Sequence, residues 1–277
     1  MKLSRGMLRA AVGALLCAAV LAGCADSAKK TEEAPPMALD PALDLSRVLE
    51  KGTLTVGVTE FEPVDYLVDG EWTGLDAELA ALFAKELGVK VAFREISWDK
   101  KVQLLAAGDI DCVWNAMTRT EELGRSIDCS VPYLSSDEVI VLPRDQFSRY
   151  DTAEKCYHLL FAVEDGSAAQ KIAAKLNLRT IAYRNQNEVF EAVLKKRCDA
   201  AIVDRLFVIV MTAEGAAFHA LQYGFPYQEE QICVGLRKGS ALTEKLNDFL
   251  TAGLSDGTIA AAAERYGLQG AVYAGNG

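Results

Sequence analysis

The sequence lacks the residues and motifs on which most enzymes depend. It has two histidines among 277 residues, His158 and His219, and neither lies in a nucleophile-elbow or zinc-protease pattern. The phosphate-binding pattern GxxxxGK[ST] is absent, and no two cysteines have the close CxxC spacing of a structural zinc site. We therefore expect no catalytic residue, no metal and no cofactor, and any ATP would be bound by a partner.

Positive charge is also scarce. The chain carries 29 lysines and arginines against 39 acidic residues, which gives a formal charge of −10 and an isoelectric point near 4.9. A nucleic-acid-binding protein presents a basic face, so we expect no nucleic-acid partner. With 51% hydrophobic and 25% charged residues, the chain is globular and long enough for two domains.

No apolar run near the start is long enough to cross a bilayer. Residues 10–21 are apolar but short, and they follow Lys2, Arg5 and Arg9, which is typical of a cleaved export signal over residues 1–23. The signal ends in the letters LAGC, which resemble the lipobox of bacterial lipoproteins. This resemblance implies lipidation of Cys24 and anchoring to the cell membrane, facing the outside or the periplasm. A plain signal peptide with an incidental cysteine is the alternative.

The segment after the lipobox cannot bury a core. Residues 25–43 are small, charged and proline-containing, so we expect a disordered tether over residues 24–44.

Five cysteines remain after the signal and the lipidated thiol, an odd number that allows at most two pairs. Cys156 and Cys198 each precede a predicted strand in the same half of the chain, which makes them a candidate disulfide in an oxidising compartment. Burial of all five as small hydrophobic side chains is the alternative. The five are Cys112, Cys129, Cys156, Cys198 and Cys233.

Strand-like and helix-like patterns alternate along the rest of the chain, and the β-α-β-α-β order occurs twice. The first series comprises residues 54–58, 75–87, 89–96, 98–107 and 110–114. The second comprises residues 159–163, 167–176, 179–183, 187–197 and 199–203. Further strands are expected at 137–142 and 231–236, and further helices at 242–254 and 258–266.

These patterns predict an α/β protein with two lobes, each a mostly parallel sheet flanked by helices, joined by two crossing hinge segments. The last helices are expected to return to the first half, so lobe 1 comprises residues 45–138 with 228–277. Lobe 2 comprises residues 139–227, and the hinge segments are 135–142 and 221–231.

The strand at 110–114 ends in a run of polar and small residues, NAMTRT at 115–120. Ligands of open α/β sheets bind at the carboxyl ends of strands, so this run is a candidate binding site. An ordinary loop whose polar residues cap the next helix is the alternative.

Seven motifs in order resemble the extracellular solute-binding protein family 3, the amino-acid-binding receptors of ABC importers with the two-lobed type II periplasmic fold. The resemblance covers about residues 45–268. The motifs are GLDAEL (74–79), WD (98–99), NAMTRT (115–120), DCSVPY (128–133), GS (166–167), DAAIVD (199–204) and DGT (256–258).

The resemblance implies a role for each matching residue. Phe61 and Trp98 would sandwich the ligand side chain, although Trp98 could equally be a core residue. Backbone and hydroxyl groups of the NAMTRT run would bind an α-carboxylate, helped by N–H groups at the start of the helix after Gly166. Asp204 would bind the α-ammonium, with helix capping as its alternative. The full expected set is Phe61, Trp98, Asn115, Ala116, Thr118, Arg119, Thr120, Gly166, Ser167, Ala168 and Asp204.

Two departures from the family's pattern concern charge. The family's carboxylate-binding arginine is replaced by Leu123, so either Arg119 or Arg125 substitutes for it or the ligand lacks a normal α-carboxylate. The first loop carries acids at 60, 62 and 65, near the expected cleft mouth. They would form a solvated rim or would favour a cationic ligand.

The resemblance implies a monomeric substrate-binding lipoprotein that captures a small polar solute, with an amino acid expected, by hinge closure. The importer's membrane subunits would recognise the closed form. The alternatives are a ligand-sensing domain, and a cyclohexadienyl-dehydratase-like enzyme on the same fold, for which Glu60 or Glu62 is the only nearby candidate for the catalytic acid.

Overall fold

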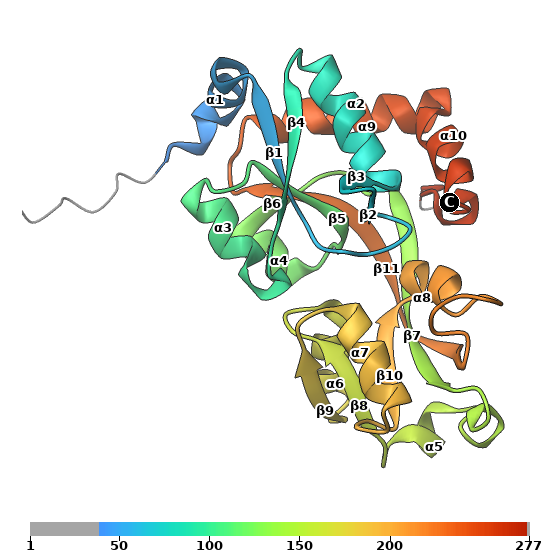
Figure 1. Ribbon diagram of the computed structural model, residues 1–277. Coiled ribbons are helices and arrows are strands. Elements are labelled where there is room, and N and C mark those ends of the chain that lie inside the picture. The colour runs from blue at the N-terminus through green and yellow to red at the C-terminus, as the bar shows by residue number, and fades with distance from the viewer. Residues whose placement is uncertain (1–38, 276–277) are drawn as a thin grey trace, which may run out of the picture. The chain divides into compact units, whose positions relative to one another are not determined.

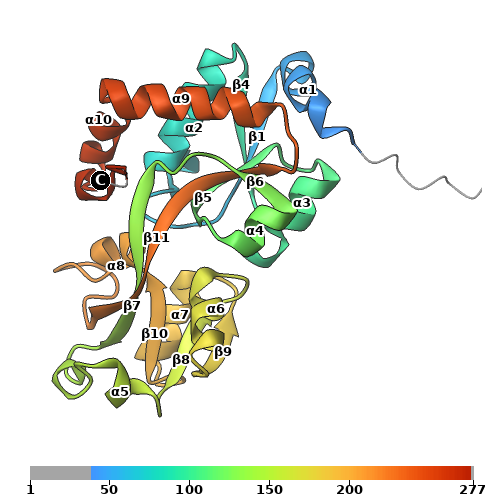
Figure 2. The same cartoon turned by 180° about the vertical axis from the view of Figure 1, so that it is seen from behind.

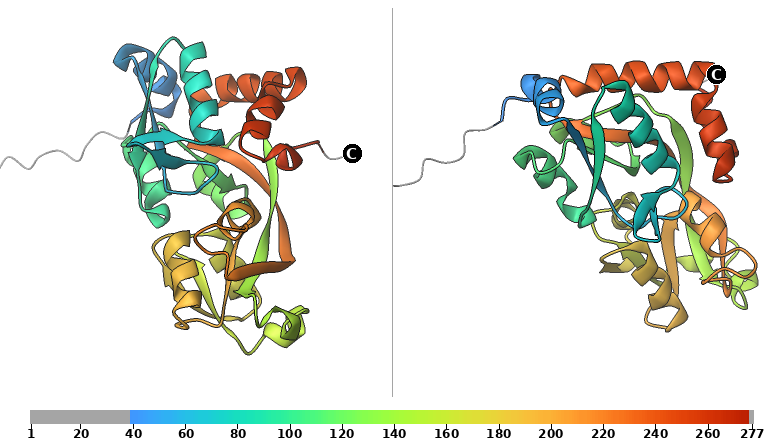
Figure 3. Two further views of the ribbon diagram at one scale, coloured as in Figure 1. Left: turned by 45° about the vertical axis from the view of Figure 1, so that its right-hand side comes forward. Right: turned by 45° about the horizontal axis from the view of Figure 1, so that its top comes forward.

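The computed structural model describes residues 39–275, whose central feature is a nine-stranded sheet shared by two lobes (Figure 1). The strand order is β4-β1-β5-β11-β7-β10-β8-β9, and β6 pairs with β11 beside this path. The two longest strands, β7 (Leu134–Pro143) and β11 (Leu221–Arg237), pair antiparallel in the middle of this order. They run from one lobe into the other, as both views in Figure 3 show, so the predicted two-lobed α/β class is confirmed.

The first lobe is built on three parallel strands, with β1 between β4 and β5. Helices from both ends of the chain cover it, and Figure 2 shows α9 and α10 lying against this lobe. Its strands are β1 (Thr53–Val58), β2 (Tyr66–Val68), β3 (Glu71–Thr73), β4 (Lys90–Glu95), β5 (Cys112–Thr118) and β6 (Ile127–Cys129). Its helices are α1 (Asp44–Lys51), α2 (Leu75–Glu86), α3 (Lys101–Ala107), α4 (Glu121–Ser126), α9 (Leu242–Asp256) and α10 (Thr258–Arg265), with short 3-10 turns η1 (Pro41–Leu43), η2 (Trp98–Lys100) and η4 (Gln269–Ala271).

The second lobe repeats the arrangement with β8 between β9 and β10, again all parallel. Its strands are β8 (Leu160–Glu164), β9 (Arg179–Tyr183) and β10 (Ala200–Asp204). Its helices are α5 (Ala153–Cys156), α6 (Ala168–Lys175), α7 (Gln186–Leu194) and α8 (Arg205–Met211), with the turn η3 (Phe147–Arg149).

Aromatic packing ties the C-terminal helices to the first lobe. Trp114 of β5 is fully buried, and its ring centroid lies 6.2 Å from that of Phe83 on α2 and 6.3 Å from that of Phe249 on α9. Burying a large apolar side chain stabilises the fold by about 1.5–3 kcal/mol. Helix α9 therefore completes a core that also contains β5 and α2, although more than a hundred residues separate α9 from these elements along the chain.

Both hinge strands, and the strand that carries the NAMTRT run, extend further than the pattern predicted. β5 continues to Thr118 because its end pairs with β11, where Met117 faces Cys233 and Thr118 faces Ile232. β11 has 17 residues, and its first part is a polar stretch with a glycine and a proline that reads as a loop in sequence. This stretch is a strand because β7 pairs along it, with two register shifts near Pro226.

The expected tether ends earlier than residue 44. Asp40 caps the turn η1 through its side chain, and helix α1 begins at Asp44. The side chain of Asp44 is buried and forms an ion pair with Arg237, Nε to Oδ2 at 3.0 Å. Residues 40–44 are therefore part of the folded lobe.

The candidate disulfide between Cys156 and Cys198 is not formed, because all five cysteines among the described residues are free. The thiol of Cys156 donates to the Thr152 carbonyl at 3.2 Å, and that of Cys198 lies 3.7 Å from the Tyr183 hydroxyl. Each thiol has its own local partner, so the two serve as buried side chains.

The expected signal peptide, lipobox and most of the tether fall on residues 1–38, outside the described residues. Within residues 39–275, no helix combines the length and the apolar character needed to cross a bilayer.

Candidate functional site

A small cavity lies between the two lobes, in front of the hinge. The first lobe lines it with Thr59, Phe61, Trp98, Asn115, Ala116 and Thr118; strand β7 adds Glu138; and the second lobe adds Glu164, Ser167, Ala168, Gln186 and Asp204. Its volume is about 30 Å³, which is room for a water molecule or two. A larger solute enters only if the lobes separate.

Eight of the eleven expected ligand residues line this one cavity, although they come from both halves of the chain. They are Phe61, Trp98, Asn115, Ala116, Thr118, Ser167, Ala168 and Asp204. Gly166 and Thr120 line an adjoining hollow that also contains Leu123 and Lys101.

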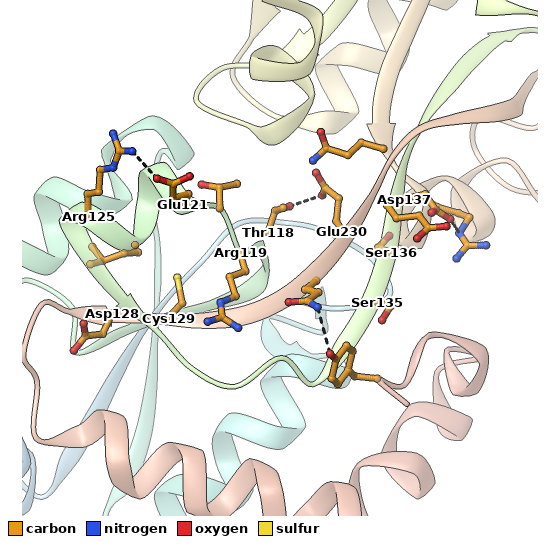
Figure 4. A pocket seen from close by; sticks show the side chains of 18 of the residues that line it. Thr118, Arg119, Glu121, Arg125, Asp128, Cys129, Ser135, Ser136, Asp137 and Glu230 are labelled. Atoms are coloured by element: carbon orange, nitrogen blue, oxygen red, sulfur yellow. Dashed lines mark hydrogen bonds and ion pairs between the residues drawn. The ribbon is translucent and has the colours of Figure 1, made fainter. Parts of the chain in front are cut away.

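Arg119 and Arg125 lie elsewhere, in an open basin of about 1220 Å³ beside the hinge strands (Figure 4). Arg125 is exposed and forms an ion pair with Glu121 at 2.6 Å. Neither arginine lines the interlobe cavity, so the position left by Leu123 has no arginine in its place.

Asn115 is held by hydrogen bonds to the first loop. Its side-chain amide donates to the Thr59 carbonyl at 3.0 Å and to Asp65 Oδ2 at 2.7 Å, and its oxygen accepts from the Thr59 hydroxyl at 2.7 Å. Asp65 is fully buried, and burial together with the nearby Asp76 raises its pKa. Asp65 therefore belongs to the interior, not to the cleft mouth where the sequence suggested it.

Ala116 adopts a left-handed backbone conformation, with φ of +45°, directly at the cavity wall. A non-glycine residue in this conformation costs about 1–2 kcal/mol. Its N–H donates to Asp76 Oδ2 at 2.7 Å, and the Tyr133 hydroxyl donates to the same oxygen at 2.6 Å. Burial raises the pKa of Asp76 to about 7, while these two bonds favour the ionised form.

The two expected aromatic residues both line the cavity. Phe61 packs edge-to-face on Phe207 of the second lobe, with ring centroids 5.5 Å apart. Trp98 lines the cavity and also belongs to a core cluster with Leu105 and Ile110, so its ligand and core assignments are compatible.

Asp204 has a structural role and also lines the cavity. Its Oδ1 accepts from the Ser136 hydroxyl at 2.6 Å and from the Leu206 N–H at 2.7 Å, which caps helix α8. Burial raises its pKa to about 6, against the effect of these hydrogen bonds. Asp204 therefore caps helix α8, as the alternative interpretation expected, and it does so through Oδ1.

Three further buried acids were missed by the sequence analysis. Glu138 lies directly opposite Asp204 in the antiparallel pairing of β7 with β10. Glu164 ends strand β8, and burial raises its pKa to about 8. Glu230 of β11 accepts from the Thr118 hydroxyl at 2.5 Å, and burial raises its pKa to about 8 as well. One feature of the sequence could have indicated Glu138. Alternate residues of a strand lie on one face, so Glu138 lies on the same face of β7 as Ser136.

Lys101 was also missed, and it ties the lobes together. It is 5% exposed, and its Nζ donates to the carbonyls of Trp98 and Gly166, each at 3.0 Å. The second of these bonds crosses from the first lobe to the second, as does the surface ion pair of Lys171 with Glu122 at 2.7 Å. Burial lowers the pKa of Lys101 to about 8, while Glu164 acts in the opposite direction.

This fold defines a two-lobed protein with a candidate binding site in the cavity between its lobes. The profile of the bacterial extracellular solute-binding proteins, family 3, matches residues 54–269, so the chain belongs to that family.

Individual relatives agree with this assignment. The chain is 28% identical to the L-cystine-binding protein TcyJ of Escherichia coli K12, over 80% of this chain and 85% of that protein. Among solved structures, it resembles the ancestral amino-acid-binding protein AncCDT-1, a precursor of cyclohexadienyl dehydratase, with a TM-score of 0.74 and 28% identity over 80% of this chain and 98% of that one. An ancestral arginine-binding protein bound to arginine gives a TM-score of 0.71 and 29% identity, over 78% and 98% of the two chains.

Replacing Tyr133 by phenylalanine removes a donor from Asp76. We expect Tyr133→Phe to destabilise the protein by about 1.5–3 kcal/mol at pH 8.5, where Asp76 is ionised, and by less at pH 5.5, where it is protonated. The lost hydrogen bond stabilises the ionised form of Asp76. Its removal therefore raises the pKa of Asp76 further and lowers the stability mainly at the higher pH. Urea denaturation at both pH values measures the difference.

The matched control is Tyr223→Phe, at a residue with 38% exposure, which should change stability little at either pH. An equal loss for Tyr133→Phe at both pH values would contradict the role assigned to the hydroxyl.

Replacing Lys101 by methionine removes the buried bond between the lobes while keeping most of the side-chain volume. We expect Lys101→Met to raise the radius of gyration of the ligand-free protein, measured by small-angle X-ray scattering, because the open form becomes more populated. Lys171→Met is the control, since a partly exposed ion pair contributes about 0–1 kcal/mol. A radius that Lys101→Met leaves unchanged would rule out the bond as a closing contact.

Proposed function

We propose that this protein is the substrate-binding component of an ABC importer, capturing a small polar solute, an amino acid or a similar molecule, between its lobes. The observation that carries the proposal is the gathering of Thr118, Ser167 and Asp204, from three separate motifs, around one interlobe cavity that Phe61 also lines. A hinge of two strands allows the lobes to close on a solute, and the closed form is what the membrane subunits recognise.

In this proposal each wall of the cavity has its own task. Phe61 and Trp98 hold the apolar part of the solute, and Asp204 accepts a charge-assisted hydrogen bond from an ammonium group. Asp204 Oδ1 already has two donors, which leaves Oδ2 for the solute.

We also propose that the protein is exported and held at the membrane by lipid on Cys24. The support is the apolar segment that ends in LAGC, which lies outside the described residues. Because several acyl chains anchor a protein stably, a Cys24→Ser variant expressed in a lipoprotein-processing bacterium should move from the membrane fraction to the soluble fraction. Immunoblotting of the fractions measures this, with Cys112→Ser as control, and a variant still in the membrane fraction would argue against lipidation.

A dehydratase-like enzyme is less well supported. Glu60 is exposed and Glu62 half-buried, and neither lines the cavity. Glu138 and Glu164 do line it and have raised pKa values, as a general acid requires. A prephenate-like diacid, however, would need cationic partners, and no Arg, Lys or His is among the residues that line the cavity.

A ligand screen tests binding against catalysis. The mature chain is screened by thermal shift against the twenty amino acids, polyamines and prephenate. A bound solute at a hundred times its Kd should stabilise the protein by about 2.7 kcal/mol and be recovered unchanged by mass spectrometry. A solute converted to product would instead identify an enzyme.

The same screen uses a matched pair of tryptophan variants. Trp98→Leu should weaken binding of the solute about tenfold or more in calorimetry, because it removes a cavity wall. Trp72→Leu, which alters a tryptophan packed on Phe93 away from the cavity, should bind normally. Equal effects of the two variants would refute the proposed site.

A further inference from the structure

The interlobe cavity is lined by acids and by no basic side chain. Glu138, Glu164 and Asp204 line it, and each is at most 6% exposed. Glu230 lies near enough to Glu138 and Asp204 to interact with both, and it is hydrogen-bonded to Thr118 of the cavity wall. Such buried carboxyls are costly unless a proton or a cation neutralises them.

Glu138 has a buried carboxyl oxygen that lacks a hydrogen-bond donor. Its Oε2 has no hydrogen-bond partner although the residue is 4% exposed and lines the cavity. It stands opposite Asp204 across the strand pair, a placement that is unfavourable for two like charges. Burial, and then Glu230, Asp204 and Glu164, hold the pKa of Glu138 well above its usual range.

One ammonium group near these four carboxyls cannot balance them. Lys101 is close enough to Glu164 for each to shift the pKa of the other. Two of its three N–H donors, however, are used by the carbonyls of Trp98 and Gly166. The carboxyl groups at the cavity therefore outnumber the ammonium groups near it, even when Lys101 is counted.

Several of the groups that would bind a ligand carboxylate are already used by the protein. The Ala116 N–H donates to Asp76, the Thr118 hydroxyl donates to Glu230, and Leu123 has no side-chain donor. At the start of α6, the Ala169 N–H favours the ionised form of Glu138, and the Gln170 N–H donates to Ser167 Oγ. The protein's own carboxyls thus take the Ala116, Thr118 and Ala169 donors, which a ligand's carboxylate would otherwise use.

We propose that the cavity takes a small dicationic amine without a carboxylate, a diamine or a guanidino-amine, instead of an α-amino acid. One cationic group would lie between Asp204 and Glu138 and the other beside Glu164, with the methylene chain between Phe61 and Trp98. This inference rests on the proposed solute-binding function and narrows it to one chemical class.

Binding of such a cation is coupled to proton release. Burial raises the pKa of Glu164 to about 8 and holds that of Glu138 well above its usual range, so the cavity holds protons at pH 7, whereas Asp204, with a pKa raised to about 6, is mainly ionised there. A bound dication lowers these pKa values, so affinity should rise with pH between 6 and 8. The other charged groups that act on the three acids are Lys101, Asp137, Asp165, Arg205 and Glu230.

Matched pairs of ligands test the inference by calorimetry on the mature chain. Arginine and agmatine, lysine and cadaverine, and ornithine and putrescine differ within each pair only by the carboxylate. We expect at least one amine to bind ten times more tightly than its amino acid, and its binding at pH 7 to release protons in buffers of different ionisation enthalpy.

Two outcomes overturn the inference and leave the proposed function standing: preference for the amino acid in the pairs that bind, and binding of a neutral amino acid such as glutamine or cystine. Absence of binding by all six probes also overturns it. Binding of an amine with no proton release contradicts the assignment of the three carboxyls.

Isosteric variants test the residues directly. Glu138→Gln and Glu164→Gln should each weaken the amine about tenfold or more and reduce the number of protons released. Glu229→Gln, which removes an acid of the open basin that does not line the cavity, is the matched control and should bind as the parent does. Parent-like affinity in both cavity variants would refute the proposal.

Discussion

The carboxyl end of β5 depends on two buried carboxyl groups, and the binding cavity depends on that strand end. Asp76 holds the left-handed Ala116 through its N–H, and Asp65 holds Asn115 through its side-chain amide. Ala116 directly precedes Met117 and Thr118, the residues at the end of β5 that pair with β11. The same short segment therefore shapes the cavity wall and joins the first lobe to the hinge.

Much of the fold was predictable because its signals are local. The apolar repeat that runs from Leu75 predicted α2, and the strand at 199–203 predicted β10 to within a residue, since both patterns are visible within a dozen residues. The polar half of β11 was not predictable, because residues 222–230 form a strand only through pairing with β7, which is distant in sequence. The burial of Asp44 was hidden for the same reason, since its partner Arg237 lies 193 residues away.

Some residues of the candidate site were predictable and others were not, for the same reason. Thr118, Ser167 and Asp204 could be predicted as cavity residues because each stands in a short motif at the end of a strand or the start of a helix. Glu138 and Lys101 could not, because an acid in an apolar strand and a lysine in an amphipathic helix are ordinary in sequence. Only the folded arrangement brings Glu138 opposite Asp204 and Lys101 to the Gly166 carbonyl of the other lobe, and their burial gives them chemical importance. The charge of the cavity is consequently a tertiary property, whereas its aromatic and hydroxyl groups are local ones.

The lobes meet through Lys101 and Gly166 around a space that holds no more than a water or two. Closure brings Glu138, Glu164 and Asp204 to the wall of this one space, so mutual repulsion among the three carboxyls opposes closure as their protons leave. A positive charge placed among them would remove this repulsion, so in the proposed receptor the charge of the cargo would set how firmly the lobes stay shut.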